Sequence, residues 1–167
     1  MMCNSLDEEG FYLGIHKDVT SSAIRNNVRL ERLAGDTCEA ILRSVLKKFT
    51  ECPESGCPGW LWENLVESEG VVEPRAWEWI KEIHFAQEIV MFFNDWDEED
   101  MFLFPDPQSV TTVLGDCYDF EYYLTNMSTD FLITFNHHDG VSACGTAMAW
   151  LRDKIDQNPE YKKQIVW

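Results

Sequence analysis

The segment FNHHDG, residues 135–140, brings together two histidines and an aspartate, side chains that bind zinc or transfer protons. His137, His138 and Asp139 are therefore candidate catalytic residues and candidate metal ligands of a His-based or metal-dependent hydrolase. Successive residues of a strand point to opposite faces, so the two imidazoles could not reach one ion from a regular strand. The chain has only two other histidines and no HExxH motif. The pattern favours a turn with positive φ at Gly140, and metal binding or catalysis is the alternative.

Other catalytic chemistry has less support in the sequence. Cys144 follows the histidines by about six residues, and we expect it in the core at a strand–helix junction rather than as a thiolate nucleophile. The chain has neither a GxSxG elbow nor a glycine-rich phosphate loop. Cys52 and Cys57 lack the two-residue spacing of a zinc or redox motif, so we predict a reduced pair rather than a metal or disulfide pair. No cofactor is predicted.

A second candidate site is the run FFNDWDEEDMF, residues 92–102, where five carboxylates surround Trp96. The run lacks the glycine and final glutamate of a calcium loop. It is either a solvated hairpin tip or a docking surface, in which carboxylates attract a basic partner and an exposed indole anchors it. The candidate partner-binding residues are Asp95, Trp96, Asp97, Glu98, Glu99, Asp100, Glu67 and Glu69.

The charge of the chain limits its partners. The formal net charge is −17, and residues 51–106 alone hold fifteen acidic and two basic residues. Such a field repels nucleic acids and anionic membranes and attracts cationic surfaces. No segment approaches the roughly 18–20 apolar residues of a membrane span, and the first residues do not resemble a secretory signal. We therefore expect a cytoplasmic protein that binds neither nucleic acid nor membrane.

The elements that must position these residues change in character along the chain. Apolar periodicity predicts helices in the first half, at 36–49 with Asp36 and Glu39 as caps, from Pro74 to 84, and less regularly at about 21–33. A short helix is expected within 59–68. In the second half, the pattern predicts a hairpin of 88–94 with 101–104, and then a helix at 106–117. A second hairpin of 119–126 with 130–136, a short strand at 141–144 and a final helix at 145–155 follow.

This order predicts one α+β domain over residues 1–167, with a mainly helical half at about 20–85 and a sheet-containing half at about 86–155. The strands fall into hairpins, so we expect an antiparallel sheet with helices packed on one side.

Three stretches resemble small acidic bacterial proteins that act as immunity factors against toxins: WLWENL, AWEWI, and DFEYYLTN…DFLITFNHHDGVSACGTAMAWL at 119–151. The last stretch is also similar to an uncharacterised bacterial family. The resemblance implies a non-enzymatic inhibitor that occludes the active site of a basic toxin or nuclease, and it transfers no residue roles. The leading hypothesis is thus an acidic protein that binds a basic protein. The alternatives are the His137-based hydrolase and a DNA-mimic antagonist of phage or mobile-element origin.

Overall fold

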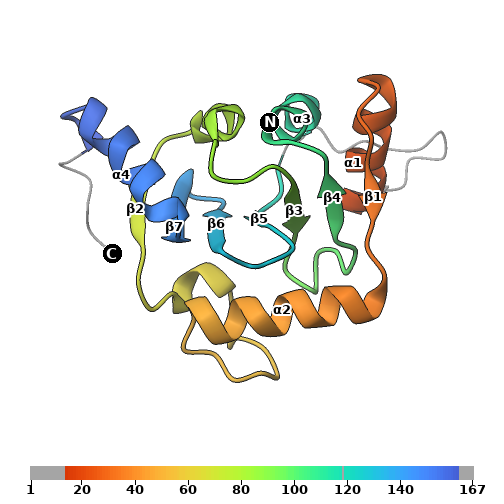
Figure 1. Ribbon diagram of the computed structural model, residues 1–167, viewed down its shortest axis with the longest axis horizontal. Coiled ribbons are helices and arrows are strands. Elements are labelled where there is room, and N and C mark those ends of the chain that lie inside the picture. The colour runs from red at the N-terminus through yellow and green to blue at the C-terminus, as the bar shows by residue number, and fades with distance from the viewer. Residues whose placement is uncertain (1–13, 118, 162–167) are drawn as a thin grey trace.

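The computed structural model describes residues 14–117 and 119–161 and shows a seven-stranded sheet with helices on both faces (Figure 1). The strands are β1 (Glu31–Arg32), β2 (Glu69–Val72), β3 (Ile89–Phe92), β4 (Phe102–Phe104), β5 (Tyr122–Thr125), β6 (Phe131–Phe135) and β7 (Gly140–Gly145). The α-helices are α1 (Gly14–Arg25), α2 (Gly35–Phe49), α3 (Pro107–Leu114) and α4 (Ala147–Gln157), and the 3₁₀ helices are η1 (Leu61–Asn64) and η2 (Ala76–Glu82).

All strand pairs are antiparallel, in the order β1-β4-β3-β5-β6-β7-β2. The α+β class and the antiparallel sheet predicted from the sequence are confirmed. The first half of the chain also contributes both edge strands, because β1 pairs with β4 and β2 pairs with β7. Residues from both predicted halves therefore belong to one sheet.

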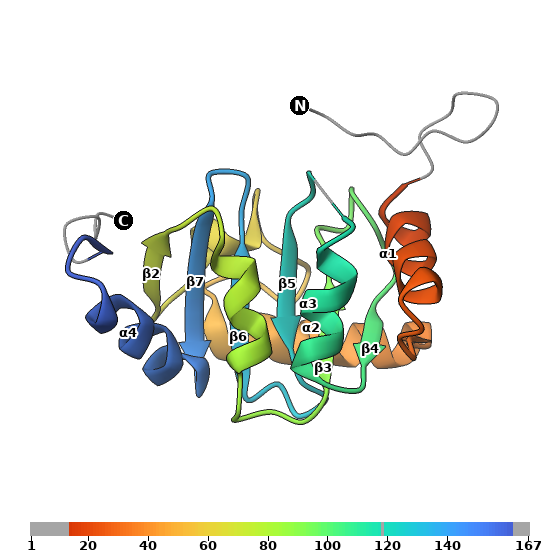
Figure 2. The same cartoon turned by 90° about the horizontal axis from the view of Figure 1, so that it is seen from above.

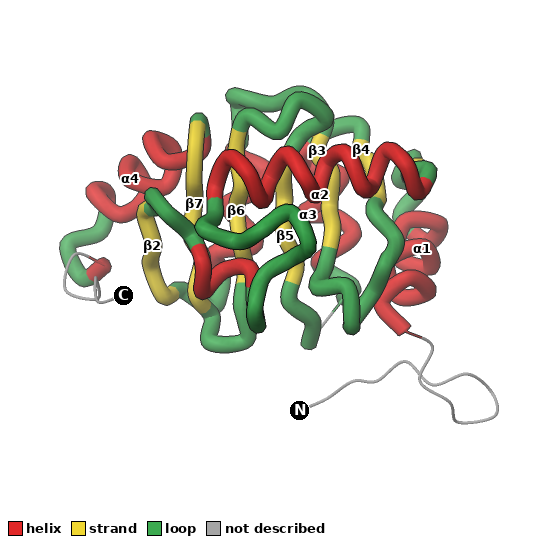
Figure 3. Tube along the Cα trace, turned by 90° about the horizontal axis from the view of Figure 1, so that it is seen from below, coloured by secondary structure: helices red, strands yellow, loops and turns green. Residues whose placement is uncertain are grey.

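The sheet is covered on both faces, not on one side as predicted. Side chains alternate along β3: Ile89 and Met91 enter the core under α1, α3, α4 and η2, whereas Val90 and Phe92 enter the core over α2 and η1. Figure 2 shows α3 on the first face, and Figure 3 shows α2 running across the strands on the second. β3, β5 and β6 are buried at every position, as expected for strands between two helical layers.

The helices predicted from strong local signals are confirmed. α2 spans Gly35–Phe49, and α3 begins with Pro107 after Asp106, whose side chain accepts a hydrogen bond from the Ser109 amide at 2.7 Å. The caps predicted for α2 are wrong, because its N-cap residue is Ala34 and no side chain caps it.

Two other predictions in the first half are displaced. The helix expected at about 21–33 is α1, which ends at Arg25 because Asn27 takes the left-handed conformation (φ 53°) and reverses the chain toward β1. The segment after Pro74 forms the 3₁₀ helix η2 instead of an α-helix.

The loop after α2 is closed by a disulfide between Cys52 and Cys57, so the predicted reduced pair is wrong. Their Cα atoms lie 4.8 Å apart, within the range that a disulfide needs. Within the described residues, no helix combines the length and apolar character needed to cross a membrane.

Candidate functional site

The two stretches singled out in the sequence lie at the same end of the sheet. We call residues 95–100, between β3 and β4, the acidic loop, and residues 137–139, between β6 and β7, the histidine turn. Antiparallel pairing of Phe92 with Tyr123, and of Tyr122 with Phe135, brings the end of β3, the start of β5 and the end of β6 together. The register thereby places Glu121 between the two loops.

Glu121 is the buried polar centre of this end, with 8% of its surface exposed. Its Oε1 atom accepts hydrogen bonds from His137 Nδ1 at 2.5 Å and from the His137 amide at 3.1 Å. Its Oε2 atom accepts from Asn94 Nδ2 at 3.0 Å. A buried carboxylate is costly unless it is paired and hydrogen-bonded, and these three donors meet that requirement.

The hydrogen bonding continues from Glu121 through Asn94 to two further side chains. The Tyr123 hydroxyl donates to Asn94 Oδ1 at 2.7 Å, and Asn94 Nδ2 also reaches Asp97 Oδ2 at 3.1 Å. Burial, and secondly the charge of Glu121, raise the pKa of Tyr123 well above its usual value, so this hydroxyl stays a donor at neutral pH. Glu121, Asn94 and Tyr123 were not predicted as site residues from the sequence, because only the strand register brings them together.

The contact between Glu121 and His137 fixes which ring nitrogen of His137 carries the proton. A carboxylate that accepts from Nδ1 requires the hydrogen on that nitrogen, which leaves Nε2 of a neutral His137 as the acceptor. General bases are oriented in this way, with a carboxylate behind the imidazole. The His137 side chain is 48% exposed, so its ring is open to solvent.

Indole rings connect the histidine turn to the acidic loop. The Trp60 ring lies 5.7 Å from His137 and 6.3 Å from Trp96, measured between ring centroids, and Trp62 lies 6.2 Å from Trp60. Trp96 is 58% exposed and Trp60 37%, whereas Trp62 is half-buried. Two large apolar rings are thus presented to solvent beside the carboxylates, and exposed aromatic clusters of this kind mark binding surfaces.

The carboxylates of the acidic loop have different roles. Asp95 and Glu99 are exposed, and within residues 14–117 and 119–161 neither pairs with another group. Asp97 is exposed as well but accepts the Asn94 hydrogen bond. Glu98 and Asp100 are half-buried and turn toward α1.

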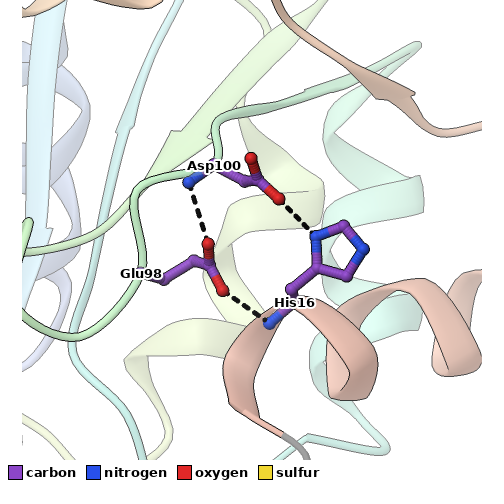
Figure 4. A group of neighbouring side chains, drawn as sticks. All are labelled: His16, Glu98 and Asp100. Atoms are coloured by element: carbon purple, nitrogen blue, oxygen red, sulfur yellow. Dashed lines mark hydrogen bonds and ion pairs between the residues drawn. The ribbon is translucent and has the colours of Figure 1, made fainter.

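Figure 4 shows how Glu98 and Asp100 hold α1. Glu98 accepts from the amides of His16 and Asp100 at 3.1 and 2.9 Å, and Asp100 pairs with His16 Nδ1. In the described part of the chain, this is the only group of three side chains spaced to hold a metal ion, with ligand atoms within 4.8 Å of one another. However, Arg32 Nη2 lies 2.6 Å from Asp100 Oδ1, where its charge would repel a cation. The group therefore attaches α1 to the acidic loop.

The histidine turn is a turn, as predicted, but its left-handed residue is Asp139 (φ 58°) rather than Gly140. A Cβ atom at Gly140 would lie 2.9 Å from the amide group of the Asn136 side chain, which accepts a hydrogen bond from the Gly140 amide and would have to shift. His138 and Asp139 are exposed, and His138 lies 3.9 Å from the His137 ring between centroids. His137 and Glu121 thus form the polar contact, and His138 and Asp139 are not gathered with them into a metal-binding group of described residues.

The remaining candidates lie elsewhere. Glu69 is on the edge strand β2, four strands from β3, and accepts from Arg152 Nε at 2.9 Å. Glu67 is exposed near Cys144, whose pKa its charge helps to raise. Cys144 is buried on β7, as expected for a core thiol, and burial is the main cause that raises its pKa to about 12.

Together these features describe an α+β protein with an acidic, indole-bearing surface at one end of its sheet. No protein-family model, curated protein or solved structure matches this chain. Its function must therefore be argued from the site itself.

Proposed function

We propose that this protein binds a basic protein partner through the acidic loop and the exposed rings of Trp60 and Trp96. In this proposal it is an immunity-type inhibitor that neutralises a basic toxin or nuclease by occluding its cleft. The observation that carries the proposal is the exposure of Trp96 (58%) in ring contact with Trp60, beside the unpaired carboxylates of Asp95 and Glu99.

The parts of this surface have complementary physical roles. Tryptophan supplies a large rigid contact area, and binding energy in protein interfaces concentrates on such anchors. Carboxylates around the anchor speed the encounter with a cationic surface and disfavour acidic partners. In the proposed complex, the carboxylates of Asp95 and Glu99 take the place of the phosphates of a nucleic-acid substrate in the cleft of a basic nuclease.

The test is partner capture with charge-reversed variants. Immobilised wild-type protein is expected to enrich a basic protein from the lysate of its own cells, and Asp95→Lys/Glu99→Lys is expected to lose it. Both residues are exposed and unpaired, so the fold should survive. Substitution of Asp97 or Glu98 would be less clean, because both make internal hydrogen bonds.

The matched control is Asp153→Lys/Asp156→Lys, which reverses two exposed charges of α4 away from the acidic loop. This control should retain the captured protein. Equal retention by both double variants, with circular dichroism unchanged, would eliminate the acidic loop as the contact.

A second candidate function rests on the Glu121–His137 contact. A carboxylate behind an imidazole, next to a half-buried indole, suits a general base that activates water for hydrolysis. Under this reading the protein hydrolyses p-nitrophenyl acetate or bis(p-nitrophenyl) phosphate, and His137→Gln lowers the rate at least a hundredfold. A wild-type rate equal to that of buffer for both substrates rejects this candidate.

The proposed location is the cytoplasm, where free thiols such as Cys38, Cys117 and Cys144 persist. The Cys52–Cys57 disulfide is instead typical of oxidising compartments. Alkylation of thiols during cell lysis, followed by mass spectrometry, decides between the two. Free Cys52 and Cys57 in the cell support the cytoplasm, and an intact disulfide opposes it.

A further inference from the structure

A groove of about 820 Å³ opens between α2, the loop closed by the Cys52–Cys57 disulfide, and the acidic loop. Its apolar lining includes Leu42 and Leu46 of α2 and, from the sheet, Phe92 and Tyr123. Phe92 and Tyr123 are each 1% exposed, so they form a rigid part of the core. The volume lies in the range of about 300–1,000 Å³ that is typical of ligand pockets.

The charge around this groove is strongly negative. Glu39 of α2 and four carboxylates of the acidic loop line it, whereas Arg32, the one basic residue in the described part of its lining, is engaged by Asp100. The Tyr123 hydroxyl is occupied by Asn94. A molecule bound in the groove therefore meets an apolar interior and acidic walls, and Trp96 lines the groove beside these carboxylates.

We propose that this groove receives an arginine side chain of the basic protein partner, which rests on the function proposed above. The aliphatic part of the arginine packs on the half-buried Cys38 and Leu42 side chains of α2, and the guanidinium group reaches the carboxylates of the acidic loop. A long side chain with an apolar stem and a positively charged end matches a groove that has an apolar interior and acidic walls.

Arginine fits this groove better than lysine for two reasons. Its planar guanidinium forms paired hydrogen bonds with carboxylates and stacks on aromatic rings, and Trp96 offers such a ring. A guanidinium is also more weakly hydrated than an ammonium group, so its desolvation in a partly apolar groove costs less free energy. The proposal thus predicts a preference for arginine over lysine at equal charge.

Gly35, the first residue of α2, permits a direct test. It lines the groove, and a Cβ atom added there would meet no heavy atom within 4 Å. Gly35→Lys therefore adds a positive charge at the edge of the groove, and its Cβ atom displaces none of the walls. The matched control is Gln108→Lys, an exposed position in the first turn of α3 on the other face of the sheet. Both variants add one charge near a helix N-terminus.

The probes are fluorescein-labelled decaarginine and decalysine, with binding followed by fluorescence anisotropy at 150 mM NaCl. Decaarginine should bind more tightly than decalysine. Gly35→Lys should weaken decaarginine binding at least tenfold, and Gln108→Lys less than twofold. Equal weakening by these two variants, or equal binding of the two peptides, overturns the inference.

The Asp95→Lys/Glu99→Lys variant separates this inference from the proposed function. If that variant loses decaarginine while Gly35→Lys retains it, the acidic loop binds cations and the groove does not. If wild-type protein binds neither peptide, both the groove and the proposed function fail.

Discussion

The Glu121–His137 contact shows how one buried carboxylate organises its surroundings. Glu121 accepts hydrogen bonds from His137 of the histidine turn and from Asn94, which follows β3. It therefore connects the histidine turn, which contacts Trp60 of the proposed binding surface, with Asn94, the residue before the acidic loop. In an inhibitor this contact would hold the surface rigid, and in a hydrolase it would orient the base.

Replacing His137 with alanine tests the structural part of that role. Glu121 would lose its ring donor but keep the amide and Asn94 donors, and the half-exposed ring limits the effect. We expect the free energy of unfolding at pH 7 to fall by about 1–2 kcal/mol, measured with urea. His138→Ala, which removes an exposed neighbouring ring, should cost under about 0.5 kcal/mol. Equal losses in the two variants would show that the contact with Glu121 stabilises nothing.

Cys144 provides a test based on pH. Burial raises its pKa to about 12, so at pH 8 only about one thiol in ten thousand is ionised. Iodoacetamide should therefore label half-buried Cys38 well before Cys144, as followed by mass spectrometry. Because the folded protein holds this proton more tightly than the unfolded chain, Cys144 contributes stability below pH 9 that declines between about pH 9 and pH 12. Rapid labelling of Cys144 at pH 8 would contradict its burial and revive it as a nucleophile.

At the scale of elements, α1 is attached by the acidic loop as well as by its apolar face. Ile15, Val19 and Ala23 pack into the core, and Glu98 accepts the His16 amide in the first turn of the helix. A carboxylate in this position satisfies an unpaired amide and complements the helix dipole. The acidic loop is therefore partly a structural connection, which its sequence did not indicate.

The corresponding variant is Glu98→Ala. It should destabilise the protein by about 1 kcal/mol and increase amide hydrogen exchange selectively in α1. Glu99→Ala, one residue on and exposed, should leave exchange in α1 unchanged. Unchanged α1 exchange in Glu98→Ala would mean that packing alone holds the helix.

The elements that the sequence predicted well are those with strong local signals. The periodicity of α2, the Asp106–Pro107 start of α3 and the apolar runs of β5 and β6 all depend on neighbours in the chain. β1 and β2 were missed because they are short and become strands only by pairing with distant β4 and β7. The helices on both faces could have been inferred from runs such as FLITF, in which every residue is buried.

The candidate site was predictable only in part. Residue types alone indicated Trp96, its carboxylates and His137. Their proximity depends on the sheet register, and the same register places the unremarked Glu121 between them. The disulfide was missed because sequence spacing does not show whether two cysteines approach closely enough to bond.

At the scale of the whole molecule, ion pairs localise the negative charge. Several acidic residues of the 51–106 segment are neutralised far from the acidic loop in sequence: Glu69 by Arg152, Glu78 by Arg75 and Glu82 by Lys154. Asp95 and Glu99, by contrast, have no partner in the described residues. The charge available to a partner is therefore smaller than the count of acidic residues in that segment suggests, and Asp95 and Glu99 contribute to it in full.

The most direct measurement of the central claim is a ¹H–¹⁵N NMR titration of the indole N–H signals with decaarginine. We predict saturable shifts of the Trp60 and Trp96 signals at 150 mM NaCl, reversed at 500 mM, because screening weakens exposed charge interactions. The signal of buried Trp150 should stay in place. Binding with the Trp60 and Trp96 signals unmoved, or equal shifts of all indole signals including that of Trp150, would contradict binding through the acidic loop and the exposed indoles.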